Sequence, residues 1–82
     1  MADRDLSVKD LQELLSAHGC RVGMSAANTF KAVLGTGLGA KTWSQHAHRS
    51  DHDTFDRHIV RAARRRLGLH EMSDEDFYAP LD

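Results

Sequence analysis

The sequence predicts an all-α fold, a compact bundle of four to five short helices with a helix-turn-helix-like unit at its centre. Apolar residues recur at intervals of three and four in several segments, as they do on the buried side of amphipathic helices. Glycine, serine and aspartate separate these segments and supply helix ends. With 82 residues, of which 40% are hydrophobic and 28% charged, the chain has the size and balance of one folded domain. We therefore predict a single helical domain over residues 1–82, in which residues 69–82 form an acidic tail.

The first predicted helix begins after Ser7. The Ser7 hydroxyl can accept a hydrogen bond from the backbone amide of Asp10, and Gly19 provides a left-handed end. One side of this segment is apolar and comprises Val8, Leu11, Leu14, Leu15 and His18. This side is expected to pack against the rest of the bundle.

Two further helices are predicted on either side of a glycine-rich turn. The link over residues 20–24 is too short to count as a sheet, although its apolar residues alternate. Ser25 is a candidate N-cap for a second helix that ends at Gly35, and residues 40–48 suit a third helix with Trp43 on its inner side. The apolar positions of the second helix are Ala26, Ala27, Phe30, Val33 and Leu34.

A fourth helix is predicted over residues 54–67, with Gly68 as its stop. Its apolar side comprises Phe55, Ile59, Val60, Ala63 and Leu67. The predicted core of the whole bundle consists of Leu11, Leu15, Phe30, Val33, Leu34, Leu38, Trp43, Ile59, Val60 and Leu67.

The acidic tail contains a candidate cap for one last helical turn, formed by Ser73 and Asp76. Three interpretations of the tail stay open. It can be a docking motif, it can fold back over the arginines of the fourth helix, or it can complete the core through Phe77 and Leu81.

The central segment fits a helix-turn-helix. Such a unit needs a small residue where its helices cross, a glycine in the turn, an apolar residue after it and an inward anchor. Ala32, Gly37, Leu38 and Trp43 occupy these four places. The third helix would then offer Lys41, Ser44, Gln45 and Arg49 to the edges of DNA bases. The alternative is two packed helices joined by a flexible loop.

The fourth helix carries four arginines on the side opposite its apolar residues. We call Arg57, Arg61, Arg64 and Arg65 the arginine stripe. Guanidinium groups at these spacings can neutralise several phosphates. The alternative is a solvated face whose arginines pair with nearby carboxylates.

Two enzyme-like patterns are incomplete. Residues 35–42 resemble a phosphate-binding loop, but Ala40 stands where the second glycine is required. His46, His48 and His52 resemble part of a hydrolase metal motif with one residue too many, and we expect no metal, no cofactor and no catalytic residue. Cys20 has no partner for a disulfide within the chain.

Over residues 8–43 the chain resembles the small helical domain of glyoxalase-superfamily-related proteins. The matching positions are Leu11, Leu15, Gly19, Val22, Ser25, Phe30, Gly39 and Trp43. The resemblance implies an all-helical module and assigns no catalytic residues.

The charge distribution favours a binding function. The net charge is −1, but residues 41–66 carry +4 and residues 67–82 carry −5. We predict a non-enzymatic DNA-binding module or regulator of a mobile genetic element, which uses the helix-turn-helix-like unit and the arginine stripe. The alternative is a phage- or plasmid-type adaptor or inhibitor that docks on a larger protein or nucleoprotein complex. A homodimer is compatible with either function. Because no secretory signal or long apolar run is present, we expect a cytoplasmic protein without membrane contact.

Overall fold

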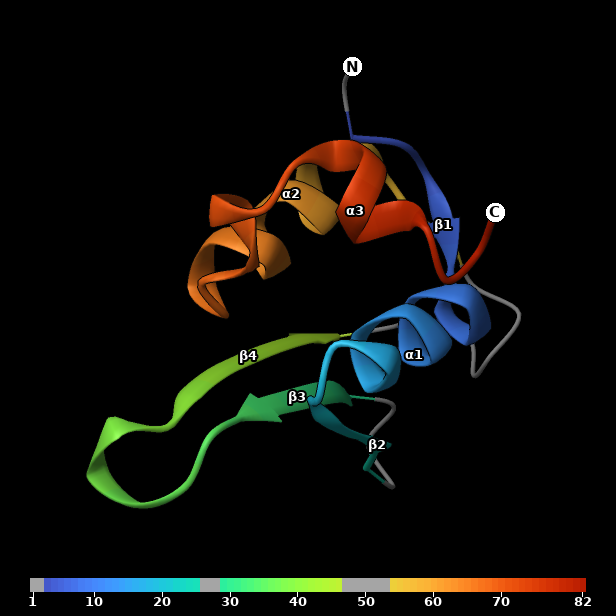
Figure 1. Cartoon of the computed structure of the whole chain (residues 1–82). Helices are drawn as coiled ribbons and strands as arrows, with labels where there is room; N and C mark the ends of the chain where they lie inside the picture. Colours follow the sequence, from blue (N-terminus) through green and yellow to red (C-terminus); the bar gives the residue numbers. More distant parts are fainter. Residues whose placement is uncertain (1–2, 26–28, 47–53) are drawn as a thin grey trace.

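The computed structural model, which describes residues 3–25, 29–46 and 54–82, has a mixed α/β fold. Its centre is a three-stranded antiparallel sheet in the order β2-β3-β4, formed by Arg21–Met24, Thr29–Leu34 and Lys41–His46. Helices α1 (Val8–Ala17) and α2 (Arg57–Arg66) lie on the same side of this sheet (Figure 1). The prediction of an all-α bundle of four to five helices is therefore wrong.

A second, two-stranded antiparallel sheet joins the starts of the two helices. Strand β1 (Leu6–Ser7) pairs with β5 (Thr54–Phe55), and α1 and α2 follow them closely in the chain. The Ser7 hydroxyl accepts from the Asp10 amide at 3.0 Å, which confirms the predicted cap of α1. The Asp56 carboxylate accepts two amides in the first turn of α2. Both helix N-termini thus have side-chain acceptors for their free amides.

The segments predicted as the second and third helices are strands β3 and β4, and the link before them is strand β2. In β3, Phe30 and Ala32 are fully buried whereas Lys31 between them is exposed, which is the two-residue alternation of a strand. The apolar residues of this segment also fit a helical spacing. Pairing with strands on both sides, together with β-branched and aromatic residues, favours the extended form. The family resemblance over residues 8–43 implied an all-helical module, and this expectation is also wrong, because the same segments form paired strands.

The prediction of a helix-turn-helix-like unit is also wrong, because the predicted turn is the connection between the two strands of a β-hairpin. Residues Gly37–Gly39 form a short 3₁₀ segment between β3 and β4. Gly35 and Gly37 have φ angles of 93° and 69°, which side-chain-bearing residues rarely adopt. Leu38, predicted to be in the core, is fully exposed in this connection. Figure 1 shows this connection at the end of the hairpin, beyond the paired strands.

The other predicted helices are confirmed, but the fourth begins three residues later than expected, because Thr54–Phe55 form strand β5 and Asp56 caps α2. Helix α2 is followed by Gly68 with φ 75°, and Gly19 after α1 has φ 92°. After a second 3₁₀ segment (Leu69–Glu71), helix α3 (Asp74–Tyr78) begins at Ser73, whose hydroxyl accepts from the Asp76 amide. Phe77 is fully buried, so the tail completes the core.

The core lies between the sheet and the helices. Phe30, Trp43 and Phe55 form an aromatic group with ring centroids 5.6 to 6.0 Å apart. Six predicted core residues are buried, namely Leu11, Leu15, Phe30, Trp43, Val60 and Leu67, and two more, Leu34 and Ile59, are partly buried against them. Val33 faces away from the helices and is half-buried.

Candidate nucleic-acid interface

The side of the three-stranded sheet that faces away from the helices is here called the open face. The strand register arranges its side chains in cross-strand rows. The first row is Arg21, Val33 and Thr42; the second is Gly23, Lys31 and Ser44; the third is Ser25, Thr29 and His46. Arg21, Gly23, Lys31 and Ser44 are exposed, in contrast to Phe30, Ala32 and Trp43 on the other side of the same strands. The open face is therefore polar, and the covered face is apolar.

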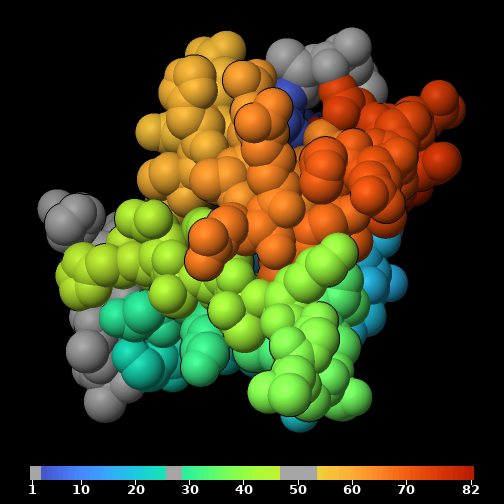
Figure 2. All heavy atoms as spheres, turned by 90° about the vertical axis from the view of Figure 1, so that its left-hand side faces the viewer, coloured from blue at the N-terminus to red at the C-terminus, as the bar shows by residue number. Residues whose placement is uncertain are grey.

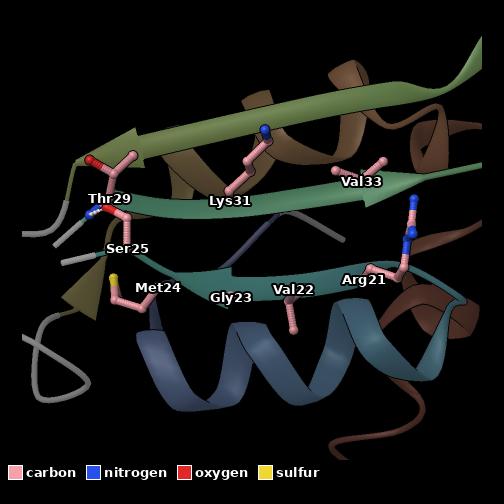
Figure 3. A pocket seen from close by; sticks show the side chains of 8 residues that line it. All are labelled: Arg21, Val22, Gly23, Met24, Ser25, Thr29, Lys31 and Val33. Carbon is pink, nitrogen blue, oxygen red and sulfur yellow. Dashed lines mark hydrogen bonds between the residues drawn. The ribbon is translucent and has the colours of Figure 1, made fainter. Parts of the chain in front are cut away.

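A groove of about 510 Å³ runs along β2 and β3 on this surface. Arg21 lies at one end of it, and Thr29 and Ser25 lie at the other (Figure 3). Gly23 is in the middle, where Lys31 is its partner on β3. Because Gly23 has no side chain, the backbone of β2 is accessible at this point.

Two cations of the open face are unpaired within the described part of the chain. Neither Arg21 nor Lys31 forms an ion pair with any residue in the described ranges 3–25, 29–46 and 54–82. No aspartate or glutamate occurs between Glu13 and Asp51 in the sequence. The whole sheet thus comes from residues 14–50, the acid-free stretch, whose charged side chains are all positive.

Residues of β4 predicted to read DNA do not share a face. Strand alternation puts Ser44 on the open face and puts Lys41 and Gln45 on the other side of the sheet. The Lys41 side chain lies against Gly68, at the C-terminal end of α2. Arg49 lies outside the described residues.

The arginine stripe divides into exposed and buried members. Arg57, Arg61 and Arg65 are exposed on α2, and the Arg61 side chain is 3.5 Å from the Asp3 carboxylate. Arg64 is only 4% exposed. Its guanidinium forms ion pairs with Asp3 at 2.8 Å and with Asp74 at 2.7 Å, so its positive charge is neutralised within the protein.

A smaller hollow of about 250 Å³ lies beside the stripe. Its lining consists of Asp3, Arg61, Arg64, Arg65, His70 and Asp74. Charges of both signs line it, and the two carboxylates already neutralise Arg64. This hollow is therefore a weaker anion site than the open face.

The other candidate sites gain no support from the geometry. His48 and His52 lie outside the described residues, and His46 is exposed at the end of β4. In the described part of the chain, no three His, Cys, Asp or Glu side chains are grouped as metal ligands are. Cys20 is buried, and this burial raises the pKa of its thiol, which disfavours the reactive thiolate.

Comparison with known proteins gives no match to a family model, to a curated protein or to a solved structure. Within the described ranges, no helix is long and apolar enough to cross a lipid bilayer.

Sequence reasoning missed the open face, although two signals for it were present. The acid-free stretch is visible in the sequence, and Val22 and Met24 alternate with Arg21 and Gly23. The first signal was missed because the charge was counted over residues 41–66, a range that cuts across the acid-free stretch. The second was missed because the link over residues 20–24 was interpreted as too short to count as a sheet.

Proposed function

We propose that this chain is a nucleic-acid-binding module that contacts phosphates through the open face of its three-stranded sheet. One observation carries the proposal: the sheet is built from the acid-free stretch and presents Arg21 and Lys31 to solvent without ion-pair partners in the described ranges. A surface with positive charge and no carboxylates attracts a polyanion.

The chemistry of the face fits a phosphate backbone. Arginine can hold a phosphate through two parallel hydrogen bonds, and lysine acts as a compact positive charge. Thr42 and Ser44 add exposed hydroxyls, which are common phosphate contacts in protein–DNA complexes.

The open face is a better polyanion site than the arginine stripe. The acid-free stretch contains four Lys or Arg residues, so the rest of the chain has a charge of −5 within the total of −1. Around α2, the carboxylates of Asp3, Asp56 and Asp74 lie close to the arginines or to the helix start. A polyanion that approaches this side meets carboxylates as well as guanidinium groups.

An acidic protein partner is the competing interpretation. Protein interfaces are enriched in aromatic residues, methionine and buried apolar area at their centres. The groove is lined by the apolar side chains of Val22, Met24 and Val33 but by no aromatic residue of the described chain, and Lys31 is central to the open face. This composition favours phosphates over a protein surface.

The test is the salt dependence of binding to labelled nucleic acid, measured by fluorescence anisotropy. We expect the double variant Arg21→Ala/Lys31→Ala to weaken binding by roughly tenfold or more at low salt. The slope of log affinity against log salt should decrease by about 0.9 for each lost phosphate contact.

The matched control is the double variant Arg57→Ala/Arg65→Ala, which also removes two exposed arginines. It should keep most of the affinity and the salt slope. If the control loses as much affinity as the open-face variant, the binding surface is α2. If the wild-type protein binds no nucleic acid and instead co-purifies with a protein after nuclease treatment, the proposed function is wrong.

A further inference from the structure

The groove over Gly23 is the feature of the open face that charge alone does not explain. On the basis of the proposed function, we infer that this groove seats the sugar–phosphate backbone of duplex DNA. Duplex DNA is then preferred to a single strand.

No structural requirement of the fold explains the glycine at position 23. Its φ angle is outside the left-handed region, and a Cβ added there would meet no atom within 4 Å. A glycine inside a strand lowers stability, because it has no side chain to pack and more freedom to lose on folding. In strands such a glycine often marks the close approach of a ligand or another backbone. Here the approach is open from the solvent side.

Two cations beside Gly23 can meet a phosphate, while Val22, Met24 and Val33 supply an apolar part of the groove lining. Lys31 is directly across from it, and Arg21 is the next residue of β2 on the same face. Residues one step apart diagonally on a sheet have Cβ atoms about 7–8 Å apart, so both cations reach the same hollow. Thr29 and Ser25 close the groove at its other end (Figure 3). Among the described residues, no carboxylate lines it.

A duplex fits this surface better than a single strand does. Proteins that bind single strands stack the bases on aromatic side chains. The aromatic residues of the described sheet, Phe30 and Trp43, are buried on its covered side. Without a stacking platform, the open face can contact only the backbone, which a duplex presents on its outside.

The breadth of the sheet also points to the backbone. Three strands place the outer strand axes roughly 10 Å apart, and side chains add to this width. The major groove of DNA is about 12 Å wide and admits a helix or a two-stranded ribbon. Helices lie behind the β2-β3-β4 sheet, and Figure 2 shows how closely β4 and the hairpin pack below α2. The sheet therefore rests on the phosphate ridges and does not enter the major groove. Binding is then largely independent of sequence.

We assign DNA rather than RNA because few neutral polar groups line the groove. Recognition of RNA duplexes depends strongly on contacts to 2′-hydroxyls. Apart from the hydroxyls of Ser25 and Thr29, the groove is lined by cationic and apolar residues and by Gly23.

The test is the variant Gly23→Val, which fills the groove without removing charge. Valine suits a strand, so the melting temperature should be unchanged or higher. Affinity for a labelled duplex of random sequence should nevertheless fall about tenfold. Gly39→Val is the matched control, because Gly39 also has open space around it but lies at the hairpin tip. It should bind like the wild-type protein.

The outcomes separate this inference from the proposed function. If Gly23→Val binds like the wild-type protein while Arg21→Ala/Lys31→Ala binds weakly, the groove inference is wrong and the function stands. A single strand of the same sequence that binds as tightly as the duplex also overturns the inference, and tighter binding of an RNA duplex overturns the assignment to DNA. If none of these nucleic acids binds, the proposed function itself fails.

Discussion

Arg64 contacts two carboxylates, a backbone carbonyl and an aromatic ring, although it lies on a helix whose other arginines face solvent. Its guanidinium donates to Asp3, to Asp74 and to the Met72 carbonyl, and it lies 4.3 Å from the centroid of the Phe77 ring. These partners come from the N-terminal segment and the tail, whereas Arg64 itself lies on α2. A single side chain therefore joins three parts of the chain, and removal of one partner would leave charge without compensation.

Asp3 makes this contact sensitive to acid. Burial opposes ionisation of its carboxyl group, but hydrogen bonds from Arg64 and Tyr78 outweigh that effect and hold the pKa below its ordinary value. The same burial, together with the hydrogen bond to Asp3, raises the pKa of Tyr78 to about 12. At neutral pH the contact is thus made by an ionised Asp3 and a protonated Tyr78.

We predict that Asp3→Asn lowers the free energy of unfolding by about 1–3 kcal/mol at pH 7. A lowered folded-state pKa means that the unfolded chain binds protons more readily, so this stabilisation is present above the ordinary pKa and is lost as the pH falls through the folded value. The difference between variant and wild type should therefore shrink towards pH 3. Urea denaturation over this pH range measures it. Glu75→Gln, an exposed acid of α3, is the control, and a constant difference at every pH would contradict the assignment.

At the scale of elements, the hairpin of β3 and β4 is the main departure from the predicted helices. Leu38 was expected to pack just after a turn between two helices, but it lies in a glycine-rich connection and is fully exposed. Leu14 on α1 has the same side chain and is fully buried. The pair allows one substitution to be compared in the two environments.

We predict that Leu38→Ala changes the free energy of unfolding by no more than about 0.5 kcal/mol. Leu14→Ala should lower it by about 2–5 kcal/mol, because it removes buried contacts and leaves a cavity. Both values come from chemical denaturation followed by circular dichroism. A large loss of stability for Leu38→Ala would indicate the packed helical turn instead of the hairpin.

At the scale of the whole molecule, charge is divided between two layers. The sheet comes from the acid-free stretch, whereas the aspartates and glutamates of the described residues belong to the helices, the termini and the connections outside that stretch. The tail is part of the second layer and is tied to it by Phe77. The Phe77 ring stacks on His18 at 5.2 Å, and its carbonyl is 2.8 Å from the His18 ring nitrogen.

We predict that Phe77→Ala lowers the free energy of unfolding by about 3–5 kcal/mol. The ring is fully buried between α1 and the Arg64 guanidinium, so its loss opens a cavity at the centre of the helical layer. Thermal denaturation measures the effect, and Leu81→Ala, at a partly buried position of the same tail, should cost much less. Equal and small effects would mean that the tail is detached from the core in solution.

Local signals in the sequence were sufficient for α1, α2 and α3. Ser7, Gly68 and Ser73 act through neighbours a few residues away, so their roles can be predicted without knowledge of the fold. The same holds for the buried positions on α1, because helix geometry alone places them on one side.

The sheet depends on contacts that the sequence does not display. A short segment such as residues 29–34 fits both a helical and an alternating pattern, and the choice is made by hydrogen bonds to two strands that lie elsewhere in the chain. For this reason the open face could not be predicted residue by residue, even though its charge was visible. Ser44 and Lys41 would share a surface of a helix but point to opposite sides of a strand.

The sequence by itself determined the three helices and their ends apart from the start of α2, together with the acid-free stretch and most of the apolar core, because these follow from composition and local spacing. Only the tertiary structure decided that Arg64 is buried, that Leu38 is exposed and that Gly23, Arg21 and Lys31 meet in one groove. The physical reason is that strand pairing and the burial of charge depend on partners distant in sequence, whose positions are set only when the whole chain folds.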